Sequence, residues 1–394
     1  MHSQKIPVDE FLVAHGGPFF ELQRRLGLLR EDALRAGIRA PLFIGLAWGV
    51  PLVLSLLAGN AFGQRAEHPY LLDLRVWGRF FLAVGLFILM ERQTQERLRV
   101  YLRQLVRAPL LAPGSFEAAA AAVTRALQRR DGRLAEAVCL AIAIAFSIAF
   151  LFRILDAEAG SWAVRVSGGR NALTPAGWWC VVVSSPIFFF LLLRWLWRLL
   201  VWSKLLRDLA ALELRLVATH PDGHGGLAFL GKYPNAYTMF VFAMSCMVGG
   251  GLAQALPGGE ISPTTYGYVM GGWLLFVLSL FAYSLSAFSK PLKTLKEQTL
   301  LACSAQATRY HRAAERALLG GNISAAEDSD PASPDTIPDP SKTFAAVGKL
   351  STLLVSRSAL LPISAAALLP LVAAGATQLP IKELLRIVKR LLLL

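Results

Sequence analysis

The sequence has little charge for its length and few cysteines. Charged residues make up 17% of the 394 residues, whereas hydrophobic residues make up 55%. A soluble globular domain carries about 25% charged residues, so this composition disfavours a soluble chain. The four cysteines, Cys139, Cys180, Cys246 and Cys303, form no CxxC pair and no Cys/His spacing. Neither a disulfide framework nor a zinc site of the usual spacing is therefore indicated.

Catalytic signatures are also missing. The chain contains no GxSxG, HExxH, Walker A or dinucleotide-binding pattern, which weighs against an enzyme and predicts no cofactor. No Asp, Glu or His lies in the middle of a long apolar run, which weighs against a proton-coupled transporter. The first forty residues are polar and charged, so no cleavable signal peptide is expected.

The chain instead contains a series of long apolar runs. Runs of about 18 or more apolar residues match the hydrocarbon core of a bilayer, which is roughly 30 Å thick. Arg75 and Arg79 weaken the second run, and Pro362 and Pro370 weaken the last. The predicted fold is an all-α, polytopic transmembrane helix bundle of six or seven spans with cytoplasmic helical extensions. The predicted spans are Pro41–Ala58, Leu74–Met90, Glu136–Phe152, Ala176–Leu193, Ala236–Leu256, Thr265–Phe288 and Ala359–Leu379.

Positive charge is distributed unevenly among the segments between the spans. The segments before the first span and after the second, fourth and sixth are rich in Arg and Lys, and the other loops are poor. This alternation predicts a cytoplasmic N-terminus. The tail breaks the alternation, so segment 359–379 either crosses or is re-entrant, and the amphipathic tail can instead lie on the membrane surface. The basic residues of the tail are Lys382, Arg386, Lys389 and Arg390.

The remaining polar segments complete the domain organisation. A stretch of prolines and acids at 320–345 predicts a disordered linker. The net charge of +14 lies beside the spans, which favours the bilayer and its anionic lipids as partners and disfavours nucleic acid. The predicted units are a cytoplasmic N-terminal amphipathic region at 1–40, a transmembrane bundle at 41–319 with cytoplasmic helices at 91–130 and 293–319, and a seventh segment with the tail at 346–394.

The most distinctive motif is HPDGHGGLAFLG at His220–Gly231, in the predicted cytoplasmic loop after the fourth span. His220, Asp222 and His224 lie within five residues, and imidazole together with carboxylate suits a transition metal. The triplet Pro221-Asp222-Gly223 also has the residues of a tight turn. Because no further pair of ligands accompanies the motif, a turn is favoured, and a metal site at the two histidines and the aspartate is the alternative.

Small residues predict one close contact between helices. Gly249, Gly250 and Gly251 lie in the fifth span, and Gly267 and Gly271 form a GxxxG spacing in the sixth. Because glycine lets helix backbones approach, spans five and six are expected to pack as a hairpin through these positions. A helix broken at the triple glycine, with carbonyl groups exposed to a permeating ion, is the alternative.

Arginine occurs both inside and beside the spans. Arg79 is the charge deepest inside a span, and an intramembrane charge is a functional candidate because its burial is costly. Its position near the outer face makes snorkelling to water the alternative. Arg194 and Arg198 alternate with tryptophans at the end of the fourth span, where both are expected to snorkel to the interface.

Several parts of the sequence form a combination of their own: Leu71-Leu72-Asp73, Arg79-Phe80, Glu91, His220–Gly231 and Thr377–Leu385. Together they resemble a set of uncharacterised bacterial multi-pass membrane proteins, and the pattern HPDxxGGLxFL is the most specific part of the resemblance. The resemblance covers most of the chain. It implies a location in the bacterial inner membrane, and it implies no activity.

Three functions are compatible with these patterns. The first is a channel or transporter-like protein, which a continuous polar cavity through the bundle would favour. The second is a membrane-anchored interaction or signalling component that acts through its basic cytoplasmic face, as a homo-oligomer or with a protein partner. A closed bundle with a large cytoplasmic platform would favour it. The third is a membrane enzyme or metal-binding protein that uses the loop of His220, Asp222 and His224.

Overall fold

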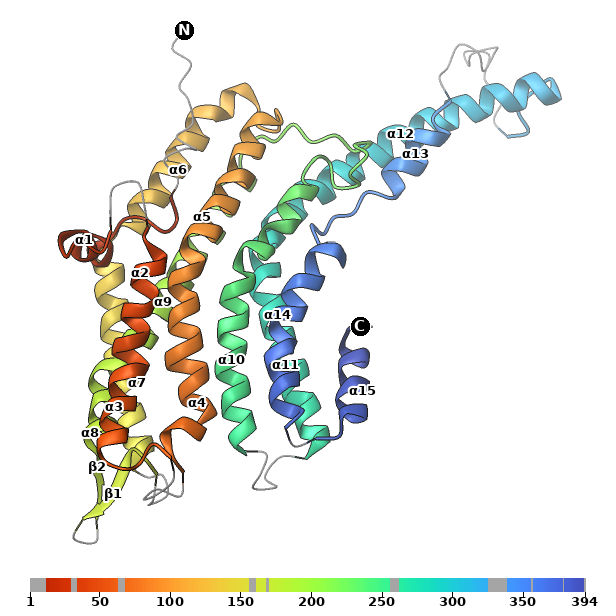
Figure 1. Cartoon of the computed structure of the whole chain (residues 1–394). Coiled ribbons are helices and arrows are strands. Elements are labelled where there is room, and N and C mark those ends of the chain that lie inside the picture. The colour runs from red at the N-terminus through yellow and green to blue at the C-terminus, as the bar shows by residue number, and fades with distance from the viewer. Residues whose placement is uncertain are drawn as a thin grey trace.

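The computed structural model is an all-α helical bundle with a small β-hairpin at one end (Figure 1). Part of the predicted linker, residues 325–338, lies outside the described residues. The structure describes residues 12–29, 34–62, 68–155, 161–167, 170–255, 262–324, 339–355, 357–377 and 379–392.

The chain before the hairpin builds one side of the bundle. Its elements are α1 (Pro18–Arg25), α2 (Ala36–Ile44), η1 (Gly45–Gly49), α3 (Val50–Leu57), η2 (Tyr70–Leu72), α4 (Leu74–Val76), η3 (Trp77–Ala83), α5 (Val84–Arg107), η4 (Pro113–Ser115), α6 (Phe116–Arg130) and α7 (Arg133–Leu155). The helices α2, η1 and α3 follow one another without a break, and so do α4, η3 and α5. The helix α6 occupies a segment that its alanine-rich sequence predicts as helical.

The chain after α7 begins with the antiparallel hairpin and then completes the bundle. Its elements are β1 (Val164–Ser167), β2 (Arg170–Leu173), α8 (Pro175–Trp179), η5 (Cys180–Ser184), α9 (Ser185–Ala210), η6 (Ala228–Tyr237), α10 (Thr238–Ala255), α11 (Pro263–Leu285), η7 (Ser286–Phe288), α12 (Ser289–Leu319), α13 (Ser341–Gly348), α14 (Arg357–Gly375) and α15 (Ile381–Leu392). The helices α6 and α12 extend past the bundle at what is called here the upper end, and the hairpin lies at the opposite, lower end (Figure 1).

Among the described residues, five helical segments are long and apolar enough to cross a bilayer. They confirm the predicted transmembrane character of the chain, and α14 adds a shorter apolar helix in the seventh predicted segment. The five segments are Ala36–Leu57, Arg133–Leu155, Pro175–Ala210, Ala228–Gln254 and Pro263–Leu319.

The second predicted span does not belong to these five. It forms the lower part of the continuous helix α4–η3–α5, and Arg75, Arg79 and Glu91 interrupt its apolar character. Its side chains are nevertheless among the most deeply buried, and those of Phe87 and Met90 are inaccessible to solvent. This helix therefore lies inside the bundle, where protein neighbours surround it on several sides.

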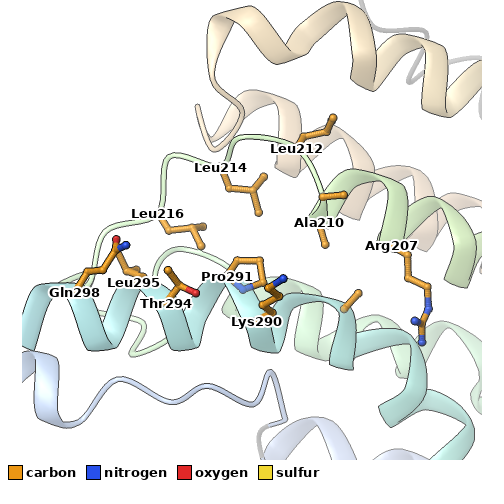
Figure 2. Close-up of a pocket in the computed structure, with 12 residues that line it drawn as sticks. Arg207, Ala210, Leu212, Leu214, Leu216, Lys290, Pro291, Thr294, Leu295 and Gln298 are labelled. Carbon is orange, nitrogen blue, oxygen red and sulfur yellow. The ribbon is translucent and has the colours of Figure 1, made fainter.

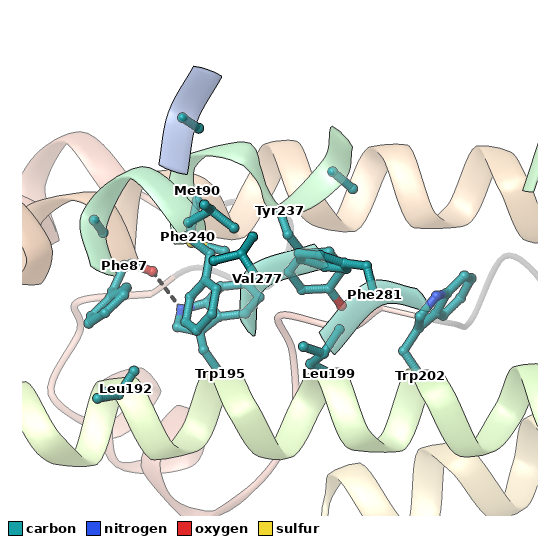
Figure 3. Packing of buried hydrophobic residues seen from close by; sticks show 14 of the residues in the cluster. Phe87, Met90, Leu192, Trp195, Leu199, Trp202, Tyr237, Phe240, Val277 and Phe281 are labelled. Carbon is teal, nitrogen blue, oxygen red and sulfur yellow. Dashed lines mark hydrogen bonds between the residues drawn. The ribbon is translucent and has the colours of Figure 1, made fainter. Parts of the chain in front are cut away.

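Aromatic side chains fill the interior between α5, α9, α10 and α11 (Figure 3). Trp195 of α9 meets the ring of Tyr237 at 6.4 Å between centroids, and Tyr237 meets Phe281 at 5.8 Å. The indole N–H of Trp195 donates to the carbonyl oxygen of Phe87 at 2.9 Å, so the one polar atom of this ring is satisfied. Large buried aromatic rings dominate the packing energy of such a core.

In the described part of the chain, three helices contain a π-helical turn, and these turns are neighbours, because η1 contacts both η3 and η5. Aromatic donors bind carbonyl oxygens of η1. The indole N–H of Trp179 donates to Leu46 at 2.9 Å, and the hydroxyl of Tyr70 donates to Trp48 at 2.8 Å.

The glycines of α10 approach other elements than the predicted hairpin partner. A Cβ atom on Gly249 would lie 2.9 Å from a carbonyl oxygen of α14, and one on Gly250 would lie 2.6 Å from a carbonyl oxygen of α4. Gly78 of η3, which continues from α4, also approaches α10 closely, since an added Cβ atom there would lie 2.5 Å from the carbonyl oxygen of Cys246. Gly251 has open space instead. Gly249 and Gly250 thus allow α10 to pack closely against α14 and α4, respectively.

The glycines of α11 face the C-terminal helix. A Cβ atom on Gly267 would lie 3.7 Å from Ile387, and one on Gly271 would lie 3.2 Å from Leu391, both on α15. The prediction that spans five and six pack against each other through these glycines is therefore wrong, because the glycines face α4, α14 and α15 instead. The helix α14 has extensive contacts with α10 and also packs against α11, which a pattern of small residues within two adjacent spans does not reveal.

Candidate functional site

A cluster of charged side chains is buried near the upper end of the bundle. Arg39 comes from α2, Glu91 from α5, Glu136 from α7, and Arg194 and Arg198 from α9. All five residues are at most 6% exposed. Because burial of a charge is costly unless the charge is paired and hydrogen-bonded, the contacts of each group decide whether the cluster is stable.

Glu91 lies among the three guanidinium groups. Its Oε2 accepts from Arg39 Nη1 at 2.5 Å, and its Oε1 lies 3.6 Å from Arg194 Nη1 and 3.9 Å from Arg198 Nη1. Arg194 also donates through Nε to Glu136 Oε1 at 2.8 Å. The cluster therefore joins four helices by ion pairs in a region that excludes water.

The segment before α2 closes this cluster. Arg198 donates to the carbonyl oxygen of Ala14 at 2.8 Å, and the carboxylate of Glu136 accepts from the backbone N–H of Phe19 at 2.7 Å. Gly17 has a φ of 86°, and a Cβ atom there would lie 2.5 Å from a carboxylate oxygen of Glu136. Glycine thus lets this backbone approach the buried acid, where a larger residue would clash.

His15 lies in the same segment and contacts Gln95. Its Nδ1 atom lies 2.8 Å from Gln95 Oε1, which also accepts the backbone N–H of Ala14 at 3.1 Å. Burial lowers the pKa of His15 below its ordinary value, the contact with Gln95 opposes this, and the positive charges of Arg130 and Arg198 reinforce it. The lowered pKa favours the neutral form of the imidazole beside the cluster.

The arginines of the fourth predicted span do not snorkel as expected. Arg194 and Arg198 are both 3% exposed and lie against buried carboxylates. The acidic partners, Glu91 and Glu136, stand at the ends of other apolar runs, where they read as ordinary residues of a helix end. The one signal of this cluster in the sequence was that charges of opposite sign lie at the ends of several apolar runs. Which of these charges pair with one another depends on how the helices are arranged.

Arg79 lies lower in the bundle, in the π-helical turn η3. Its guanidinium carbon lies over three aromatic rings, at 5.0 Å from the centroid of Phe150, 5.7 Å from that of Phe188 and 5.9 Å from that of Phe80. The negative faces of aromatic rings attract a cation, so these contacts offset part of the cost of burying the charge.

The HPDGHGG segment forms a turn around the carboxylate of Asp222. That carboxylate accepts three backbone N–H groups, from His224 at 2.8 Å, Gly226 at 3.1 Å and Ala228 at 3.0 Å. Burial by itself raises the pKa of Asp222, but these three donors outweigh it and hold the pKa below its ordinary value. The ionised aspartate is therefore a structural part of the turn.

Three glycines of this turn have positive φ angles. The values are 68° at Gly223, 67° at Gly225 and 99° at Gly226, a region in which side chains cause strain. An added Cβ atom on Gly225 would lie 3.2 Å from Leu292 of α12, and one on Gly226 would lie 2.9 Å from Leu110. The turn is thus packed tightly against α12 and against the segment after α5.

The turn also anchors the chain that leads into α14. The backbone N–H of Ser351 donates to the carbonyl oxygen of Gly223 at 2.9 Å. Lys296 of α12 donates to the carbonyl oxygens of Gly348 and Leu350 at 2.9 and 2.8 Å. The motif that is most distinctive in the sequence is therefore a junction between α12, the loop after α9 and the segment before α14.

The two histidines of the motif flank Asp222 in the sequence, and each has a ring nitrogen close to an oxygen of that residue. His220 Nδ1 lies 2.9 Å from Asp222 Oδ1, and His224 Nδ1 lies 2.8 Å from the carbonyl oxygen of Asp222. Within the described part of the chain, no three His, Cys, Asp or Glu side chains are grouped so that they could hold a metal ion. Metal binding at His220, Asp222 and His224 stays a prediction, and the turn accounts for these contacts without it.

A groove of about 680 Å³ lies at the upper end, between the end of α9 and the start of α12 (Figure 2). Leu212, Leu214 and Leu216, from the chain that follows α9, line one wall. Pro291 and Leu295 of α12 line the other. Its walls are therefore more apolar than polar, and Thr294 and Gln298 of α12 add polar groups to the lining.

Two cationic side chains also line this groove. Arg207 donates through Nη2 to the carbonyl oxygen of Tyr283 at 2.9 Å, and its guanidinium lies 3.9 Å from the centroid of the Tyr283 ring. Lys290 is exposed at the first turn of α12. Among the residues that the structure describes, no carboxylate forms an ion pair with Arg207 or Lys290. The groove thus combines apolar walls with two unneutralised positive charges.

Comparison with known proteins found no match to a family model, to a curated protein sequence or to a solved structure.

Proposed function

We propose that this chain is a multi-pass protein of the bacterial inner membrane and serves as a membrane-anchored interaction component. Its N-terminus and the whole upper end lie in the cytoplasm in this proposal, because most segments rich in Arg and Lys, the tail helix α15 excepted, gather there. The bacterial location rests on the resemblance carried by the HPDxxGGLxFL pattern. A protein partner or a second copy of the chain binds at the cytoplasmic face.

One contrast carries the proposal: the interior of the bundle is filled, whereas its upper end is extended. A channel or transporter needs a polar path through the membrane, lined by groups that replace water around the solute. Trp195, Tyr237 and Phe281 instead occupy the space between the central helices. The helix α12, with 31 residues, continues far beyond the bundle and carries α13 along it (Figure 1). These features favour an interaction component with a cytoplasmic binding surface over a channel or transporter.

Apolar side chains at the far end of α12 support the same conclusion. Leu318 and Ile323 are 84% and 82% exposed, and Leu319 between them is also exposed. These residues lie beyond the apolar part of the helix, in the polar segment that would stand in water. Exposed apolar residues that gather in water mark a surface for a protein partner.

Photo-crosslinking in cells tests the proposal. A photoreactive residue at Leu318 or Ile323 should give an adduct with a second protein or a second copy of the chain. The same residue at Arg309, which is exposed on the same helix, serves as the matched control and should give little. Absence of any adduct from Leu318, Leu319 and Ile323, together with ion or solute flux in proteoliposomes of purified protein, would favour the channel instead.

A further inference from the structure

The outer surface of α11 marks the level of the two membrane interfaces. Tyr268, Leu275, Phe276 and Tyr283 are all exposed, and the pairs Tyr268/Leu275 and Phe276/Tyr283, each seven residues apart, lie toward one side of the helix. Tyrosine favours the boundary between lipid and water, whereas leucine and phenylalanine favour the hydrocarbon. The two tyrosines are about 22 Å apart along the helix axis, somewhat less than the roughly 30 Å hydrocarbon core, so they bracket most of the apolar belt of a bilayer.

The cations of the groove lie at the upper interface by this measure. Arg207 stacks on Tyr283, so both occupy the same level. Lys290 follows Tyr283 by seven residues in the continuous helix α11–α12, which places it about 10 Å further along the axis and on a similar side. Lys290 therefore lies at the level of the phosphates of the cytoplasmic leaflet and Arg207 lies just below it, given the orientation of the proposed function.

We propose that this groove binds one anionic phospholipid of the cytoplasmic leaflet, and the inference rests on the membrane insertion in the proposed function. Arg207 and Lys290 hold the phosphate, and the acyl chains descend along the exposed face of α11 past Tyr283 and Phe276. Leu214 and Leu216 shield the contact from water, which strengthens the attraction between the phosphate and the two cations.

The chemistry of the groove favours a lipid over a peptide. Arg207 lies on a surface that continues into the apolar exposed face of α11. A ligand that has both a phosphate and acyl chains can therefore contact the cation and the apolar face together. The volume of about 680 Å³ lies within the range of pockets that hold a small ligand, and it is suited to a headgroup with its glycerol. An acidic peptide of a partner protein would use the two charges but would leave the apolar face of α11 unused.

Counting of bound lipid on the purified full chain tests the inference. Native mass spectrometry in detergent should show one phosphatidylglycerol retained in preference to phosphatidylcholine. Lys290→Gln and Arg207→Gln should each weaken this retention about tenfold, because each removes one charge-assisted contact with the phosphate. Lys293→Gln is the matched control, since it removes the same charge from the same helix but lies outside the groove, and it should leave retention unchanged.

The outcomes separate the alternatives. Equal retention of phosphatidylglycerol by wild type and Lys290→Gln, which alters an exposed side chain and leaves folding intact, would overturn the inference. Competition by glycerol phosphate as strong as that by the lipid would overturn it in favour of a small-anion site. A photoreactive residue at Leu214 that traps a second protein in cells, with lipid retention unchanged in all variants, would overturn it in favour of a peptide. If the proposed partner surface at the end of α12 is wrong, the adducts at Leu318 and Ile323 are absent, and the retention of lipid is unaffected.

Discussion

Glu91 is the residue on which the buried charge cluster depends. It accepts from Arg39 and faces Arg194 and Arg198, so its removal leaves several buried positive charges with less compensation. A buried ion pair adds little stability compared with an apolar pair of the same shape, but the loss of one partner is expensive. The role of this residue in stability is therefore much larger than its net charge suggests.

Glu91→Gln should destabilise the protein by about 3–5 kcal/mol, because it leaves buried guanidinium groups without their carboxylate. The measurement is the unfolding midpoint of the purified protein in detergent. Glu96→Gln is the control, since Glu96 lies on the same helix and pairs with Arg92 at the surface, where both side chains are largely exposed. That variant should show no measurable change. Equal effects of the two substitutions would contradict the central role of Glu91.

At the scale of the element, the HPDGHGG turn shows how a conspicuous motif can serve architecture. Asp222 binds three backbone N–H groups, and the turn ties α12 to the chain before α14. The groove that is proposed to bind lipid shares Leu216 and Leu295 with the packing surface of this turn. Substitutions that distort the turn should therefore disturb the groove as well. Loss of a histidine ring should leave both the turn and the groove in place.

Gly226→Val should lower the folded yield strongly, because the position has a φ of 99° and an added Cβ would lie 2.9 Å from Leu110. His224→Ala should keep nearly the yield of the wild type, since only the contact of its ring with a carbonyl oxygen is lost. Yield and metal content are measured together on both variants. Stoichiometric metal in the wild type that disappears in His224→Ala would refute a purely structural turn and would support the metal hypothesis.

At the scale of the whole molecule, the distribution of charge and of aromatic residues supports the proposed orientation. Most of the positively charged segments lie at the upper end, with the basic helix α15 beside Gly267 and Gly271 of α11 as the exception, and the exposed tyrosines of α11 bracket an apolar belt below that end. The native cysteines, Cys139, Cys180, Cys246 and Cys303, are all buried, so they give little background in a labelling experiment. This property makes the orientation directly measurable in cells.

Single cysteines at Ser3 and Ser324 should resist a membrane-impermeant maleimide added from the periplasm, because both positions are expected in the cytoplasm. A cysteine in place of Arg165, which is exposed on the hairpin at the lower end, is the positive control and should react. Each site is scored before and after the membrane is permeabilised. Labelling at Ser3 or Ser324 in intact cells would reverse the proposed topology.

The sequence by itself determined those features that depend on local chemistry. Apolar length predicted the spanning helices, and the alanine-rich composition predicted α6. The predicted end of the helix at 319 is observed, and Gly320 adopts a φ of 76° there, as glycine does after a helix. The glycines and the aspartate after His220 predicted a turn in the same way. In each case the residues that decide the structure are neighbours in the chain.

Only the tertiary structure decided which surfaces meet. Arg194 and Glu136 are 58 positions apart, and their pairing required α7 and α9 to lie side by side. The glycines of α10 were recognised as sites of close approach, but their partners came from α4 and α14. A helix surface allows many partners of similar energy, and the choice among them depends on how all the helices pack at once. For the same reason, neither the buried charge cluster nor the groove beside Arg207 was visible in the order of residues.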